Sequence, residues 1–168
     1  YDEIFRIPFI LRLPENAHAG TTTDALGVNV SLAGTLIESA GLDVPSSFKG
    51  GSMMSVVRGE DPGSEHIFFE HYGAYWGIHP LRAIRTREWK YIRYYGEDDT
   101  EELYYLLKDP DEITNLAGEP ACSETRDHLR RLVDTWWSET NGRDLGYYES
   151  EAFKTIGGDL ESLRAVDR

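Results

Sequence analysis

The sequence predicts an α/β chain in two parts. The first part is the last strand and helices of an α/β layer, and the second is a roughly four-stranded antiparallel sheet packed by a C-terminal helix. Three observations lead to this prediction. A short apolar run, Ile7–Leu13, precedes a stretch with helical periodicity; the middle of the chain alternates turns with branched and aromatic residues; and helical spacing returns from Ser123.

The composition is that of a globular protein with an acidic surface. The 168 residues carry a net charge of -13, and 40% of them are hydrophobic, which suffices for a packed core. Such a surface repels phosphate groups, so we expect no nucleic-acid partner and no adsorption to anionic membranes. The single cysteine, Cys122, lacks a partner for an internal disulfide or a zinc site, and we expect it to be a partly buried packing residue.

Residues 1–63 are predicted to form the end of an α/β layer. Ile7–Leu13 is almost continuously apolar and is closed by Pro14, as in a strand buried on both faces of a parallel sheet. The chain contains few other runs of this kind that could be its neighbours, and it opens on Tyr1 rather than Met. We therefore expect the sequence to be part of a longer protein.

Two helices are predicted in this first part. Apolar residues recur at helical spacing from Val30 to Ala40. Gly41 follows at the position where a helix commonly ends with a glycine in the left-handed conformation. This pattern predicts an amphipathic helix. After the Gly-rich connection that follows, Ser52 is placed to cap a short helix that runs through Arg58.

Residues 64–142 are predicted to form an antiparallel-sheet subdomain with a terminal helix. Four segments are rich in aromatic and branched residues and are separated by turn residues: His66–His71, Leu81–Thr86, Trp89–Tyr95 and Glu102–Leu107. The helix from Ser123 carries a broad apolar stripe and is expected to end at Asn141-Gly142 and to pack across the sheet. Residues 143–168 are expected to form an irregular tail.

Four stretches, in this order, resemble the C-terminal part of the sulfatases, which belong to the alkaline phosphatase superfamily. They are Tyr1–Arg12; Val30–Leu36 with Ala40–Leu42 and Gly50–Ser52; Arg82–Thr86 with Trp89–Ile92; and Glu102–Leu106 running into Asp109–Glu112 and Asn115–Ala117. The resemblance covers residues 1 to about 142. It departs from the family pattern at Ser31 and Tyr105, where the family has Asp, and at Gly34, where it has Pro.

The resemblance implies an alkaline phosphatase-like fold. For the full-length parent it implies hydrolysis of a sulfate monoester with formylglycine and calcium. Formylglycine is made from a Cys/Ser-x-Pro-x-Arg motif, which this sequence lacks, since Cys122 is followed by Ser123-Glu124. We therefore expect no catalytic residue, no metal ligand and no cofactor in this chain, and we expect the chain alone to be inactive. The sulfate-ester substrate would be engaged through the missing N-terminal part.

The resemblance also implies that the C-terminal subdomain leans over the mouth of the active site. The segment after the first predicted strand carries aromatic and histidine side chains that suit a sugar or aryl ring. We predict that His71 and His79 face the substrate, with Arg82 as a third binding residue; the alternative for each is a packing or ion-pairing role. A metal site built from His66, His71 and His79 is disfavoured because residues five apart on a strand point to opposite faces.

Two other interpretations of the function stay open. The parent could be a phosphonate monoester hydrolase or phosphodiesterase of related architecture, which only assays on the full protein would separate from a sulfatase. Alternatively, the chain could be a non-catalytic binding or interaction module derived from a sulfatase, and would then be soluble and monodisperse by itself. A chain removed from a larger sheet should instead expose an apolar edge at Ile7–Leu13 and self-associate.

Overall fold

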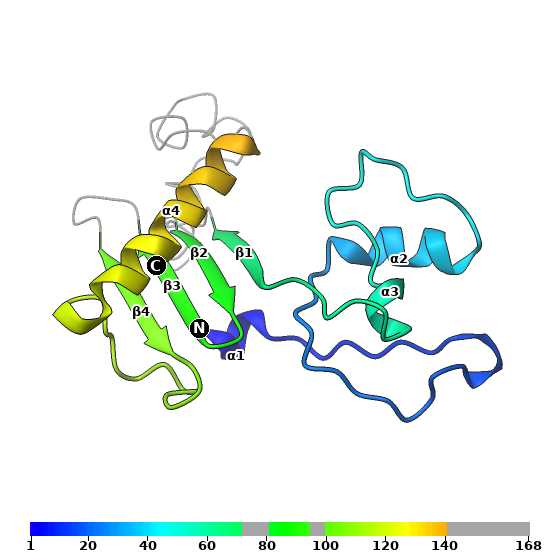
Figure 1. The fold of residues 1–168 in the computed structure, drawn as a ribbon, viewed down its shortest axis with the longest axis horizontal. Coiled ribbons are helices and arrows are strands. Elements are labelled where there is room, and N and C mark those ends of the chain that lie inside the picture. Colours follow the sequence, from blue (N-terminus) through cyan, green and yellow to red (C-terminus); the bar gives the residue numbers. More distant parts are fainter. Residues whose placement is uncertain (72–80, 95–99, 141–168) are drawn as a thin grey trace, which may run out of the picture. The chain divides into compact units, whose positions relative to one another are not determined.

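The computed structural model describes residues 1–71, 81–94 and 100–140 (Figure 1). The chain divides into two compact units, Tyr1–Ile67 and Phe68–Arg168. In the described part, no helix is long and apolar enough to cross a bilayer. The predicted tail, residues 143–168, and the predicted helix end at Asn141-Gly142 lie outside the described residues.

The predicted sheet is present, with its four strands adjacent in chain order. The strands are β1 (His66–His71), β2 (Leu81–Thr86), β3 (Trp89–Tyr94) and β4 (Glu101–Tyr105). β3 pairs antiparallel with both β2 and β4. The β2–β3 turn is closed by Thr86, whose hydroxyl oxygen accepts hydrogen bonds from the backbone N–H groups of Glu88 and Trp89 at 3.2 and 2.9 Å.

The last strand is shorter than the prediction of Glu102–Leu107. It ends at Tyr105 because the chain turns there: the N–H groups of Lys108 and Asp109 both bond to the Tyr105 carbonyl, at 3.1 and 3.0 Å. Leu107, which the prediction placed in the strand, is exposed.

The terminal helix α4 (Ser123–Glu139) packs across the sheet, as predicted (Figure 1). Its buried residues Leu129, Val133 and Trp137 recur every four residues and so share one face. The core beneath this face is made by Ile84, Tyr91, Leu103, Ala117, Leu129 and Val133, with Cys122 packed at its margin, partly buried as expected. A 3-10 turn, Pro120–Cys122, leads into the helix.

A buried ion pair fixes the loop after β4 to the sheet. The ammonium of Lys90 on β3 lies 2.8 Å from Oε1 of Glu112, and the two side chains are only 0% and 1% exposed. Since Tyr91 packs in the core under α4, the alternation of a strand places Lys90 on the opposite face. Glu112 itself adopts a left-handed backbone conformation, φ 54°. The sequence predicted a turn here and gave no indication that its glutamate is buried.

The same loop holds β4 through Asn115. Its side-chain oxygen accepts hydrogen bonds from the backbone N–H groups of Leu103 and Ala117, at 3.0 and 2.9 Å. Its amide nitrogen donates to the Glu101 carbonyl at 3.0 Å. Asn115 therefore completes the outer edge of the sheet, where a further strand would otherwise have to supply these partners.

The first unit contains three helices, α1 (Asp2–Phe5), α2 (Ser31–Ser39) and α3 (Met54–Val57), and a 3-10 turn, Pro14–Asn16. α2 ends as predicted at Gly41, which has φ +76°; the N–H groups of Gly41 and Leu42 bond to the carbonyls of Glu38 and Ile37. The prediction that Ser52 caps a helix running through Arg58 is wrong in detail: Met53 is at the N-cap and the helix ends at Val57, although the Ser52 hydroxyl oxygen accepts the N–H of Met54 at 3.1 Å.

The face of α2 that packs within this unit is its small, polar one. The Ser31 hydroxyl donates to the Gly50 carbonyl at 2.8 Å, and the Thr35 hydroxyl oxygen accepts the N–H of Met53 at 3.0 Å. Gly34 permits this approach, since a Cβ there would lie 1.9 Å from the Gly51 carbonyl oxygen. The apolar stripe that predicted the helix faces solvent instead, with Leu36 55% exposed.

The strand predicted over Ile7–Leu13 is not formed in the structure. These residues have no regular secondary structure, and Ile7 and Ile10 are 65% and 91% exposed. The prediction rested on apolar composition alone, whereas a strand needs a neighbour to hydrogen-bond with. The four strands of the described chain pair with one another, and none of them pairs with this segment.

Replacing Lys90 by Met should destabilise the second unit by about 3–5 kcal/mol, because the Glu112 carboxylate would stay buried without its counter-charge. Adding Glu112→Gln to Lys90→Met should restore part of the loss, since no buried charge remains. Urea unfolding followed by tryptophan fluorescence measures this unit, because all four tryptophans lie at or after Trp76. Equal stability of Lys90→Met and the exposed control Asp134→Ala would contradict the role of the pair.

Candidate functional site

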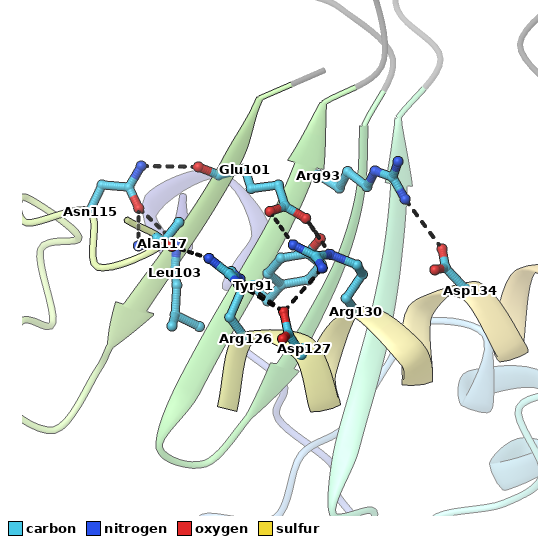
Figure 2. Close-up of polar contacts among 10 residues, drawn as sticks. All are labelled: Tyr91, Arg93, Glu101, Leu103, Asn115, Ala117, Arg126, Asp127, Arg130 and Asp134. Atoms are coloured by element: carbon cyan, nitrogen blue, oxygen red, sulfur yellow. Dashed lines mark hydrogen bonds and ion pairs between the residues drawn. The ribbon is translucent and has the colours of Figure 1, made fainter. Parts of the chain in front are cut away.

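The densest polar cluster among the described residues joins β3, β4 and α4 (Figure 2). Arg130 on α4 donates hydrogen bonds from two nitrogens to the Glu101 carboxylate, and its Nε lies 2.6 Å from Oε1. The Tyr91 hydroxyl donates to the same carboxylate. Asp127 lies beside Arg130 and Arg126, with both ion pairs at 3.0 Å. Bidentate pairing of this kind fixes the position of a helix on a sheet.

The protonation states in this cluster follow from its contacts. Burial, and then the hydrogen bond to Glu101, raises the pKa of Tyr91 far above its ordinary value, so the hydroxyl keeps its proton. Burial would by itself raise the pKa of Glu101, but the hydrogen bonds from Arg130 and Tyr91 outweigh it and hold that pKa below the ordinary value. The hydrogen bond to Glu101 in turn raises the pKa of Arg130.

These states do not suit proton exchange near neutral pH. A general base must exchange protons near neutral pH, and Glu101 is held ionised while Tyr91 is held neutral. The cluster instead joins the start of β4 to the middle of α4. A surface ion pair, Arg93–Asp134 at 3.7 Å, adds a second contact between β3 and the same helix.

A row of stacked rings joins β1 and β2 to the last turns of α4. Phe68 on β1 stacks on Trp136, with ring centroids 4.7 Å apart and planes 5° apart. Trp136 is followed by Trp137, whose centroid lies 6.0 Å away. The guanidinium of Arg82 on β2 lies over the Trp137 ring, 3.3 Å from its centroid. Stacking on an indole keeps the N–H donors of a guanidinium in the plane parallel to the ring.

The three predicted substrate-binding residues have different positions. His71 is the last residue of β1 and is partly buried. Arg82 is the second residue of β2 and stacks on Trp137, a contact that the sequence did not indicate. His79 lies outside the described residues, as does the rest of the segment between β1 and β2.

The formylglycine and the metal ion of the sulfatases would require a Cys/Ser-x-Pro-x-Arg motif and a group of metal-ligating side chains. The full sequence holds no Cys/Ser-x-Pro-x-Arg motif. Within the described ranges, no three His, Cys, Asp or Glu side chains are grouped so as to hold a metal ion. His66 and His71 stand at the two ends of β1, and the third member of the disfavoured histidine site, His79, is not among the described residues.

Solved sulfatases, which have the alkaline phosphatase-like fold, contain a region with the fold of this chain. Among solved structures with this fold is one in complex with its substrate D-glucosamine-2-N,6-O-disulfate, at TM-score 0.63 and 27% identity, covering 71% of this chain and 26% of that one. Another is a 2-O GAG sulfatase, at TM-score 0.58 and 33% identity, covering 64% of this chain and 24% of that one.

Sequence comparison gives the family. The family model for N-sulphoglucosamine sulphohydrolase, C-terminal, matches residues 1–138. An N-acetylglucosamine-6-O-sulfatase of Bacteroides thetaiotaomicron is 31% identical over 160 residues, 92% of this chain. A Delta 4,5-hexuronate-2-O-sulfatase of the same organism is 33% identical over 141 residues, 81% of this chain. The chain therefore belongs to the sulfatases, as a C-terminal sulfatase domain. It spans 29% of the length of each of these two relatives.

Acid should weaken the contact between β4 and α4. Because the folded pKa of Glu101 is depressed, its stabilising contribution is complete above the ordinary value of 4.5 and is lost as the pH falls through the folded pKa. The wild-type chain should thus lose more stability between pH 7 and pH 3 than Glu101→Gln does, as measured by urea unfolding at each pH. The exposed control Glu119→Gln should follow the wild type. A Glu101→Gln variant with the wild-type pH dependence would contradict this assignment.

Proposed function

We propose that this chain is the C-terminal region of an enzyme that hydrolyses sulfate monoesters of carbohydrates. The observation that carries the proposal is the similarity of most of the chain to sulfatases whose names specify sugar substrates, namely N-acetylglucosamine 6-O-sulfate and an unsaturated hexuronate 2-O-sulfate. Similarity to the protein solved with D-glucosamine-2-N,6-O-disulfate supports the same substrate class. The whole enzyme would bind such a sulfate ester and release inorganic sulfate.

The chemistry of that hydrolysis would be supplied outside this chain. Sulfatases normally use formylglycine and a divalent metal in the full-length enzyme. Since the sequence lacks the Cys/Ser-x-Pro-x-Arg motif and the described residues contain no group of three metal-ligating side chains, no catalytic step is assigned to them. The contribution of this region would be to shape the pocket that selects the group bearing the sulfate, on a rigid sheet fixed by the Lys90–Glu112 and Glu101–Arg130 pairs.

His71, His79 and Arg82 are the residues that we propose for substrate contact. Imidazole groups bond sugar hydroxyls, and a guanidinium pairs with a sulfate or a uronate carboxylate. The support for Arg82 is its stacking on Trp137, which fixes a cation near the start of β2. The support for His71 is its place at the end of β1, where the chain leaves the sheet.

The assay that tests the function uses the protein encoded by the whole reading frame. That frame should continue upstream of Tyr1 to a Cys/Ser-x-Pro-x-Arg motif. The purified product should release sulfate from 6-O- or 2-O-sulfated amino sugars or uronates. Release of phosphonate from a phosphonate monoester, without sulfate release, would favour the alternative enzyme class; a phosphonate monoester hydrolase of Agrobacterium radiobacter shares the fold at 22% identity and TM-score 0.59. A frame that begins at this chain would favour a binding module.

In that enzyme, His71→Ala and Arg82→Ala should each raise KM about tenfold or more, because a hydrogen bond to a charged group contributes roughly 1.5–3 kcal/mol. Arg82→Lys should raise KM less than Arg82→Ala does, because lysine keeps the charge but lacks the planar group that stacks on an indole. His128→Ala, on the exposed side of α4, is the matched control and should leave kcat and KM unchanged. Wild-type KM and kcat in His71→Ala would remove this residue from the site.

We also propose that the chain, when separated from the rest of the enzyme, self-associates through Ile7–Leu13. The support is the exposure of Ile7, Phe9 and Ile10 in a segment that has no strand neighbour. A domain that had adapted to stand alone would be expected to cover or charge such a segment.

A further inference from the structure

Two arginines lie directly opposite each other on adjacent strands of the second unit. Arg82 on β2 is the register partner of Arg93 on β3. Residues two apart on a strand share a face, so these arginines lie on the same side as Ile84 and Tyr91, which pack in the core under α4. Arg82 is the second residue of β2 and Arg93 the second-last of β3. The two guanidinium groups therefore share the α4 side of the sheet, close to one of its ends.

This arrangement of two positive charges is unfavourable for strand pairing by itself. Like charges directly opposite each other on adjacent strands destabilise a sheet. Asp134 of α4 offsets part of the repulsion, because its carboxylate lies 3.7 Å from Arg93 (Figure 2). This distance exceeds the roughly 2.7–2.9 Å of a charge-assisted hydrogen bond. The side chains of Arg93 and Asp134 are 25% and 49% exposed, so this ion pair is open to solvent and to a solute.

The acidic residue in the same cross-strand row has a different role. Glu101 on β4 is the register partner of Arg93 and so lies on the same face of the sheet. Its carboxylate accepts hydrogen bonds from two nitrogens of Arg130 and from the Tyr91 hydroxyl. Glu101 therefore presents its charge to α4, and the basic part of the row lies toward β2.

Trp137 fixes the orientation of the Arg82 guanidinium. The group lies 3.3 Å from the centroid of the Trp137 ring, and a guanidinium stacked in this way directs its N–H donors outward in its own plane. The Trp137 ring is itself held, because it is only 8% exposed and lies beside Trp136, which stacks on Phe68. A fixed support of this kind reduces the entropy that a ligand must remove from the arginine on binding.

The group that two neighbouring guanidinium groups recognise is an anion with several oxygen atoms. Carboxylate and sulfate both have this chemistry, since arginine donates two parallel N–H groups to such oxygens. A sulfated substrate also needs a local basic site, because the net charge of the chain is -13. The sulfate that reacts would be held where the chemistry is supplied, outside this chain. A second anionic group of the substrate is therefore the better match.

We propose that Arg82 and Arg93 form a subsite for a second anionic substituent of the sugar, either a carboxylate or a sulfate other than the one hydrolysed. Trp137 is the positioning residue that holds Arg82 in this subsite. The inference rests on the proposed function, because it takes a sulfated sugar as the substrate, and it adds Arg93 and Trp137 to the residues named there. The enzyme should then prefer substrates that carry a second negative charge.

Sulfate release by the protein encoded by the whole reading frame tests this preference. Substrates are compared in pairs that carry the same reacting sulfate and differ in one group. One pair has an N-sulfate or an N-acetyl group on the amino sugar, and the other has a uronate carboxylate or the hydroxymethyl group of the corresponding hexose. Arg93→Ala should raise KM about tenfold or more for the doubly anionic member of one pair, and by less than about threefold for the other member. The pair that responds identifies the group.

Variants of Trp137 test the positioning role. Trp137→Phe keeps an aromatic face and should retain most of the preference, whereas Trp137→Leu should lose it while kcat for the singly anionic substrate stays. A merely structural role would instead lower kcat/KM equally for both members of a pair. Arg131→Ala, at an exposed position of α4, is the matched control and should keep the wild-type preference. Arg93→Ala keeps the test valid if Trp137→Leu does not fold.

An equal effect of Arg93→Ala on both members of each pair overturns the proposal, as does a wild-type enzyme without preference for a second anion. If the protein releases no sulfate, the proposed activity fails, and calorimetric titration with glucosamine 2-N,6-O-disulfate then tests the subsite by itself. Binding that Arg93→Ala weakens about tenfold and Arg131→Ala leaves unchanged supports the subsite. Absence of binding, or equal binding by both variants, overturns it.

Discussion

The ammonium of Lys90 and the carboxylate of Glu112 meet in the interior of the second unit, 2.8 Å apart and shielded from water. Removing two charges from water costs several kcal/mol for each ion, and only close pairing offsets this. The arrangement therefore requires the loop after β4 to return to β3 at one position. Once the loop is there, Asn115 completes the hydrogen bonds of β4, and the start of β4 presents Glu101 to Arg130 on α4.

These contacts explain the last of the four stretches that resemble the sulfatases, which includes Asp109–Glu112 and Asn115–Ala117. Its acidic and amide residues are not a metal site: Asp109 accepts the N–H groups of Ile113 and Thr114 at 3.1 and 2.9 Å, Glu112 pairs with Lys90, and Asn115 bonds to β4. These three side chains bond to backbone groups or pair with a buried ammonium group. The loop can thus lie close to the sheet although it has no regular secondary structure.

The two units are stabilised in different ways. The second combines a core between sheet and helix with two ion-pair contacts, and it buries apolar side chains among its own residues. The first is held by backbone and hydroxyl hydrogen bonds around Gly34 and Gly50, and leaves several of its leucines and isoleucines exposed. The second unit is therefore a rigid support, whereas the first leaves apolar side chains exposed.

The sequence alone determined the elements whose pattern is local. Segments of aromatic and branched residues between turn residues defined the strands, helical spacing of apolar residues defined α2 and α4, and Gly41 marked a helix end. Each of these signals depends on neighbours within a few residues. Tertiary structure decided the rest. Nothing local distinguishes Lys90 from an exposed strand lysine, shows which face of α2 packs, or places Arg82 on Trp137. Tertiary structure also determined whether Ile7–Leu13 forms a strand, because a strand needs a hydrogen-bonding partner and such partners can come from distant parts of a chain.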